Sequence, residues 1–119
     1  MLNITIANNC IQRAMGLIGR SGLSPDEGLL IPRCCRVHTV GLRFAIDAVF
    51  LDADGIVVAV FSGLFPWKYT PRIEGAVSCL ELAAGGAVRH HLRLGETIPY
   101  QIIFSLMHAG GLALVTGGN

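Results

Sequence analysis

The chain has 119 residues, of which 52% are hydrophobic and only 14% are charged. This length suits one domain, and this composition supplies a hydrophobic core, so a disordered protein is excluded. A net charge of +1 argues against a general nucleic-acid-binding protein, which usually carries a basic excess. We therefore expect one folded domain over residues 1–119 and no nucleic-acid partner.

The first elements in chain order are a short strand and a helix. Apolar and polar residues alternate over Leu2–Ala7, which predicts a strand. Residues Cys10–Arg20 place apolar side chains at helical spacing, which predicts a helix. A neighbouring stripe on this helix holds Arg13, Gly16 and Arg20. Gly16 lowers the helix propensity, and a plausible use for it is close approach of another backbone.

A hairpin is expected in the middle of the chain. Ile46–Leu51 and Ile56–Phe61 are strong strand candidates because both are rich in β-branched and aromatic residues. The residues Asp-Ala-Asp-Gly at 52–55 lie between them and are typical of a hairpin turn. Earlier in the chain, the short apolar run 29–31 ends at a proline, and residues 34–43 are expected to form a loop that enters a strand.

The second half of the chain alternates loops with short elements. Residues 62–75 hold two prolines and two glycines, which predicts a loop. A strand over Val77–Leu82, a short helix over Ala83–Leu92 and a last strand over Thr97–Phe104 are expected to follow. Many short strands with one or two helices favour a mainly β (α+β) fold, a small compact β-barrel-like domain.

The two ends of the chain bear on localisation. The N-terminus lacks the basic and apolar regions of a signal peptide, so we expect a cytoplasmic protein whose four cysteines are thiols. Residues 98–115 are largely apolar and could nearly span a bilayer, but they contain a proline, a histidine and paired glycines. We prefer a core strand followed by a tail packed on the domain or on a neighbour, and we expect no membrane association.

A polar cluster in an apolar segment is the main candidate site. His38, Arg43 and Asp47 lie among apolar residues, and Arg13, Arg20 and Glu81 complete the polar set. In an extended segment Arg43 and Asp47 point to one face, and an arginine can hold a carboxylate through two parallel hydrogen bonds. One interpretation is a structural ion pair; the other is a cleft for a small anionic or polar ligand. The candidate binding residues are Arg13, Gly16, Arg20, His38, Arg43, Asp47 and Trp67.

Catalysis is a second hypothesis, and metal binding is not expected. His38 and Asp47 could form an acid–base pair, because a carboxylate can orient an imidazole. The nucleophiles available lie in no recognised nucleophile motif. Adjacent cysteines are poor joint metal ligands, and neighbouring histidines on a helix point apart. We therefore expect neither a metal nor a cofactor. The residues weighed as nucleophiles or ligands are Cys10, Cys34, Cys35, Thr39, Ser62, Cys79, His90 and His91.

Trp67, the only tryptophan, lies in a proline-bounded loop beside Phe65 and Tyr69. It is either an exposed contact for a protein partner or a lid over the barrel. A protein-interaction module that uses this loop and the apolar C-terminal tail is therefore a third hypothesis.

Six short motifs follow one another along the chain: Arg13-Ala14-Met15-Gly16-Leu17-Ile18-Gly19-Arg20, Leu23 with Asp26-Glu27-Gly28-Leu29-Leu30, the block from His38 to Asp52, Pro66-Trp67-Lys68, Leu80-Glu81-Leu82-Ala83-Ala84-Gly85, and Leu94-Gly95-Glu96. In this order and spacing they resemble the domain-of-unknown-function 192 family. The similarity covers roughly residues 9–104 and implies a small, mostly β fold without an established catalytic mechanism. The leading interpretation is therefore an uncharacterised accessory or binding module, and a small hydrolase or isomerase is an alternative.

Overall fold

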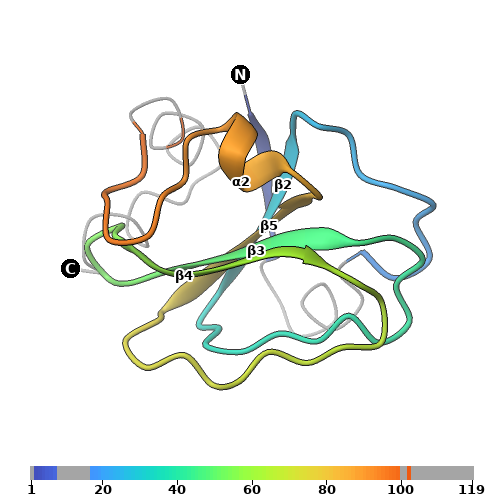
Figure 1. Cartoon of the computed structure of the whole chain (residues 1–119), viewed down its shortest axis with the longest axis horizontal. Helices are drawn as coiled ribbons and strands as arrows, with labels where there is room; N and C mark the ends of the chain where they lie inside the picture. Colours follow the sequence, from blue (N-terminus) through green and yellow to red (C-terminus); the bar gives the residue numbers. More distant parts are fainter. Residues whose placement is uncertain (1, 8–16, 100–101, 103–119) are drawn as a thin grey trace.

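A computed structural model describes residues 2–7, 17–99 and 102. They form a five-stranded sheet with strand order β1-β2-β5-β3-β4, and a short helix, α2, lies above it (Figure 1). β1 and β2 are parallel, and the other neighbouring strands are antiparallel. The elements are β1 (Asn3–Ile6), β2 (Glu27–Pro32), β3 (Ile46–Leu51), β4 (Val57–Leu64), β5 (Ser78–Ala83) and α2 (Gly86–Arg89).

The predicted mainly β architecture is confirmed. Among the described strands, β1 and β4 are the edges, so the sheet is open rather than closed into a barrel. The strands predicted at Leu2–Ala7, Ile46–Leu51 and Val77–Leu82 correspond to β1, β3 and β5.

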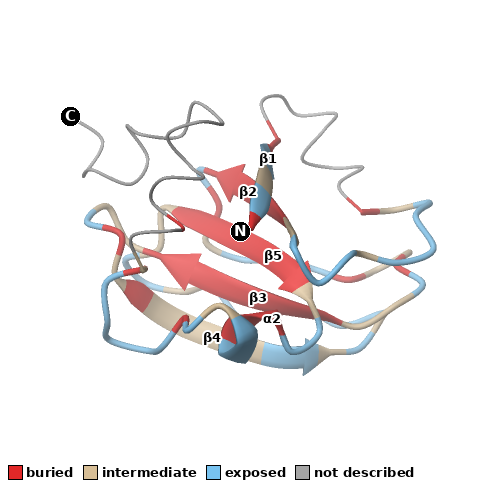
Figure 2. Ribbon diagram, turned by 90° about the horizontal axis from the view of Figure 1, so that it is seen from above, coloured by how far each residue is buried: buried red, intermediate tan, exposed pale blue. Residues whose placement is uncertain are grey.

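β3 is buried on both faces, which explains its almost uninterrupted apolar sequence. On one face, Val49 and Leu51 pack in a cluster with Ala87 of α2. On the other face, Ala48 and Phe50 pack in a cluster that includes buried side chains of residues 33–44. We call residues 33–44 and 65–77 the loop layer, because these two segments run together below the sheet (Figure 1). Figure 2 shows β2, β5 and β3 almost wholly buried, with β4 partly exposed at the edge.

The predicted hairpin joins β3 and β4. Oδ1 of Asp52 accepts the backbone N–H groups of Asp54 and Ile56, each at 2.9 Å. Gly55 adopts a φ of 77°, a conformation that favours glycine. The aspartate and the glycine of the predicted turn therefore both have a direct structural use.

Two elements differ in length from the prediction. β4 continues to Leu64, so residues 62–64 are strand rather than loop. Gly63 at φ 61° lies at a register shift between β3 and β4, and this irregularity explains why the strand passes through a glycine. The helix expected over Ala83–Leu92 is reduced to α2, because Ala83 ends β5 and Gly85 turns the chain with a φ of 90°.

Two further predictions meet the structure only in part. Leu17–Gly19 form a turn, with Gly19 at φ 89°, so the predicted helix does not continue to Arg20; its part over residues 10–16 lies outside the described residues. Thr97 makes only an isolated bridge with Ile56, so the described part of the last predicted strand is wrong. The N–H of Ile102 bonds to the carbonyl of Pro99 at 2.9 Å, a bond that two residues of one extended strand do not make.

Among the residues that the structure describes, no helix has the length and hydropathy needed to cross a bilayer. Most of the apolar stretch 98–115 lies outside these residues.

Candidate functional site

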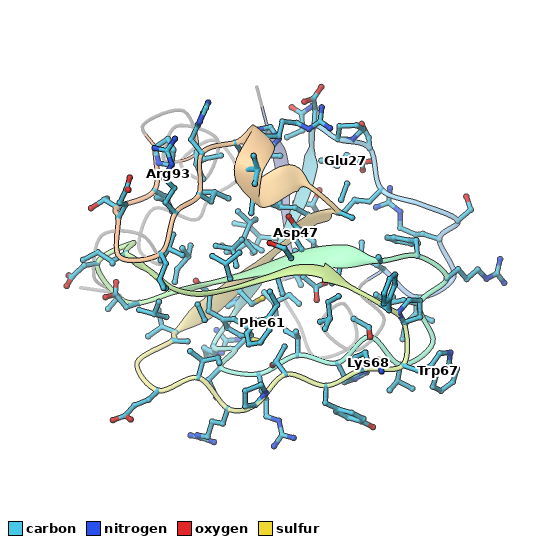
Figure 3. The ribbon with its side chains drawn as sticks, in the orientation of Figure 1. Glu27, Asp47, Phe61, Trp67, Lys68 and Arg93 are labelled. Atoms are coloured by element: carbon cyan, nitrogen blue, oxygen red, sulfur yellow. The ribbon has the colours of Figure 1, made fainter. Side chains whose placement is uncertain are left out.

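Asp47 is fully buried in β3, and its carboxylate is satisfied by backbone groups. Oδ1 accepts the N–H of Gly63 at 2.8 Å. Oδ2 accepts the N–H groups of Gly85 at 3.2 Å and of Ala87 at 2.9 Å. The side chain lies between β3 and α2 (Figure 3). Three N–H donors satisfy a buried carboxylate without a counter-ion, so Asp47 ties β4 and the start of α2 to the centre of the sheet.

The loop layer holds two of the predicted partners of Asp47, His38 and Arg43, which are both exposed. Asp47 pairs with Leu82 and faces α2, whereas Val37 and Leu42 pack against the opposite face of the sheet. The sheet therefore separates Asp47 from the segment that carries His38 and Arg43. The structure does not bring these three side chains together, neither as an ion pair nor as an acid–base pair.

Glu81 is the second buried carboxyl group and lies on the other side of the sheet from Asp47. It pairs with Ala48 of β3 and Leu29 of β2, and its exposure is only 5%. Burial raises the pKa of its carboxyl group from 4.5 to about 7, because the charged form loses its hydration. Glu81 therefore retains a proton over a pH range in which an exposed glutamate is ionised.

Arg20 is engaged at the surface. Its Nη2 donates to Oε2 of Glu27 at 2.9 Å and to Oε1 at 3.2 Å. Oε1 of Glu27 also accepts the N–H of Ser24 at 2.9 Å. The hydrogen bond from Arg20, with that from Ser24, lowers the pKa of Glu27 below its usual 4.5. This exposed pair fixes the turn before β2. It lies at the upper end of the molecule in Figure 3, away from the loop layer.

Thr39 holds the two segments of the loop layer together. It is fully buried, and its hydroxyl donates to the carbonyl of Phe65 at 2.7 Å and accepts the N–H of Lys68 at 2.8 Å. Its backbone N–H bonds to the carbonyl of Lys68, and its carbonyl accepts the N–H of Trp67. Thr70 makes a similar clamp to Val37. Residues 65–70 are therefore a fixed loop.

This fixed loop presents its aromatic side chains to solvent. Phe65, Trp67 and Tyr69 are 68%, 67% and 67% exposed, and Trp67 projects outward from the loop layer (Figure 3). The ring of His38 lies 5.9 Å from the ring of Tyr69. We call Phe65, Trp67, Tyr69 and His38 the aromatic surface. Of the two interpretations of Trp67, the exposed contact fits this geometry and the lid does not.

Positive charge is concentrated on the loop layer, which also carries the aromatic surface. The loop layer holds five of the nine positively charged side chains of the protein and one of its eight acidic side chains, all exposed. Its net charge is therefore +4, whereas the whole chain carries +1. Sequence reasoning overlooked this segregation, although it is visible in the sequence once the two loop segments are known to be neighbours. The charged residues are Arg33, Arg36, Arg43, Lys68, Arg72 and Glu74.

Four of the side chains weighed as nucleophiles or metal ligands are buried or are bonded to other groups. The hydroxyl of Thr39 is occupied in the clamp, and Sγ of Cys34 donates to a backbone carbonyl at 3.0 Å. Burial raises the pKa of the Cys79 thiol well above its usual range, which makes it a poor nucleophile. Nε2 of His90 lies 2.9 Å from the carbonyl of Pro25. Within the described ranges, no three histidine, cysteine or acidic side chains are grouped as metal ligands would be.

Three residues of the sequence-based analysis, Cys10, Arg13 and Gly16, lie outside the described residues. The predicted roles of Arg13 and Gly16 in binding therefore stay predictions.

The model of the DUF192 family, described as an uncharacterized ACR, matches residues 1–100. The chain belongs to the DUF192 family. This assignment confirms the family resemblance seen in the motifs. No curated protein matches the sequence significantly.

Two solved structures resemble this DUF192 protein in fold. One is a protein of unknown function from Novosphingobium aromaticivorans, with a TM-score of 0.73 and 20% identity over 83% of this chain and 75% of that chain. The other, titled a "putative transcription regulator", is from Sinorhizobium meliloti, with a TM-score of 0.68 and 24% identity over 79% of this chain and 78% of that chain. At these identities the likeness establishes the fold alone.

Proposed function

We propose that this DUF192 protein is a non-catalytic interaction module that binds a protein partner through its aromatic surface. The observation that carries the proposal is the exposure of three large aromatic rings, each by about two-thirds, on a loop that buried hydroxyl groups hold in place. Tryptophan and tyrosine are enriched in the energetically important centres of protein interfaces. A rigid loop also loses little conformational entropy on binding.

The backbone of Trp67 gives a second argument. Its φ is 66°, in the left-handed region that costs a residue other than glycine roughly 1 kcal/mol or more. Glycine would make this turn without strain. A tryptophan that is both strained and exposed contributes little to folding, so its use is best explained by contacts with another molecule.

The alternative functions have less support. A hydrolase or isomerase based on His38 and Asp47 would need these side chains together, and the sheet lies between them. A cleft for a small anionic ligand that includes Arg13 and Gly16 stays a prediction from the sequence, as does a cytoplasmic location.

A photoreactive amino acid placed in the aromatic surface tests the proposal. We would replace Phe65 with p-benzoylphenylalanine, irradiate cells of the source organism, and separate the adducts by mass. The same probe at Val88 of α2, which is 80% exposed, is the matched control. We expect a discrete protein adduct from position 65, absent from position 88 and lost when Trp67→Gly is added. Identical adducts from both positions, or an adduct that persists without the Trp67 ring, would refute the proposal.

A further inference from the structure

We infer that the partner of the aromatic surface is an acidic peptide segment of a protein, one that carries carboxylates beside an apolar anchor residue. This inference rests on the proposed function, since it names the chemistry of what binds there. It stands on a separate observation, the charge of the loop layer.

The positive charge of the loop layer is available to a partner. Arg36, Arg43, Lys68 and Arg72 are exposed, and the ion pairs found among the described residues join Arg20 to Glu27 and Arg93 to Glu96. The four side chains therefore keep their charge unneutralised by neighbouring carboxylates. A concentration of one sign of charge around an apolar centre selects a partner of the opposite sign.

The residue types favour carboxylates as the complementary groups. Three of these four cations are arginines, and the planar guanidinium group binds a carboxylate through two parallel hydrogen bonds. Arginine and tryptophan are also the residues most often found at energetic centres of protein interfaces. A loop layer that exposes both aromatic side chains and arginines therefore fits a peptide that carries acidic residues beside an apolar side chain.

The charge of the rest of the chain favours a short acidic segment over a polyanion. Outside the loop layer the chain carries a net charge of −3, since the whole chain carries +1 and the loop layer carries +4. A nucleic acid or an anionic bilayer extends beyond one patch and would meet this acidic remainder, whereas nucleic-acid-binding domains are usually basic overall. A short peptide would contact the basic patch alone.

Selection from an unbiased displayed library of short random peptides tests both the proposed function and the acidic chemistry inferred for the partner. The protein would be used as bait beside two variants: Trp67→Gly, which removes the ring, and the double variant Arg36→Glu with Arg72→Glu, which lowers the net charge of the loop layer from +4 to 0. Arg89→Glu on α2, which makes one of these two charge changes on the other side of the sheet, is the control. Circular dichroism spectra and thermal unfolding of each variant would first establish that it is folded.

We expect the selected peptides to be enriched in aspartate and glutamate next to an apolar residue. Their affinity should fall at least about tenfold in Trp67→Gly and about tenfold in the double variant, and should stay unchanged in Arg89→Glu. The affinity should also weaken as the salt concentration rises.

The other outcomes distinguish a failure of the inferred acidic chemistry from a failure of the proposed function. Peptides that require Trp67 but are neutral or basic would overturn the acidic chemistry and leave the proposed function standing. Peptides that bind equally without the Trp67 ring, or no selected peptides at all, would overturn both. A single-stranded oligothymidylate and vesicles of equal phosphatidylglycerol and phosphatidylcholine would be measured in parallel. Tighter binding to either one than to the peptides, dependent on Trp67 and on Arg36 and Arg72, would overturn the assignment of a protein partner.

Discussion

Replacement of Asp47 by asparagine should destabilise the fold without preventing it. Asparagine has the same shape, but one of the two carboxylate oxygens becomes an NH₂ group. If the remaining oxygen keeps the bonds to Gly85 and Ala87, the NH₂ group faces the N–H of Gly63, which now bonds to Oδ1 at 2.8 Å. One donor is then left unpaired, which costs about 1–3 kcal/mol.

The two bonds that remain also lose their charge assistance, which adds roughly 1 kcal/mol. We therefore expect the free energy of unfolding to fall by about 2–4 kcal/mol and the Tm by roughly 10 °C. Most domains of this size are stable by about 5–15 kcal/mol, so the variant should still fold. Asp47→Ala should cost more, because all three N–H groups would lose their acceptor.

Urea denaturation followed by circular dichroism measures this effect. Fluorescence is a poor probe here, because Trp67 is already exposed in the folded protein. Asp54→Asn at the tip of the hairpin is the control, since it removes the same charge from an exposed position and should change the stability by no more than about 0.5 kcal/mol. If Asp47→Asn were as stable as Asp54→Asn, the structural role assigned to Asp47 would be wrong.

Three further predictions concern Glu81 and the loop layer. The pKa of Glu81 is raised from 4.5 to about 7 in the folded protein. At pH values between these two pKa values, the folded state therefore binds more protons than the unfolded state. The free energy of unfolding should fall by up to about 3 kcal/mol as the pH rises from about 4.5 through 7. Denaturation at a series of pH values should show this slope in the wild type and its loss in Glu81→Gln. Thr39→Val removes the hydroxyl group that bonds to Phe65 and Lys68. The free energy of unfolding should fall by about 1–3 kcal/mol, and the fluorescence anisotropy of Trp67 should fall because the loop is held less firmly. An unchanged anisotropy would contradict the role of Thr39 in holding the loop. Trp67→Gly relieves the strain at φ 66° and should raise the free energy of unfolding by up to about 1 kcal/mol. Trp67→Ala keeps the strained φ and should not raise it. A glycine variant less stable than the wild type would show that the ring stabilises the fold.

The sequence predicts the central strands well because their signals are local. The run of β3, apolar except for Asp47, and the Asp52 to Gly55 turn are short-range features, and both appear as expected. The length of α2 is less predictable, because Ala83 pairs in β5 and Gly85 turns the chain before the helix begins. A Cβ atom at Gly86 would lie 2.7 Å from Cβ of Leu82, so the helix packs directly on β5, and no local pattern reveals this close approach.

The candidate site is predictable only in part. Trp67 stands out in the sequence as a lone tryptophan between prolines. The assignment of Asp47 to a cleft with Arg43 fails because Arg43 is exposed whereas Asp47 is fully buried, and because the donors of Asp47 are backbone groups far away in the chain. The concentration of positive charge on the loop layer becomes visible only when residues 33–44 and 65–77 are known to be neighbours, joined by bonds such as that between the N–H of Thr70 and the carbonyl of Val37.

The most direct test of the aromatic surface is acrylamide quenching of Trp67 emission, in the protein alone and with a saturating peptide from the selection. Because Trp67 is the only tryptophan, the signal reports on one ring. We expect quenching close to that of free indole in the isolated protein and strong protection in the complex. A ring that is shielded in the isolated protein, or one that stays equally quenchable in the complex, would contradict the assignment of this surface as the binding site.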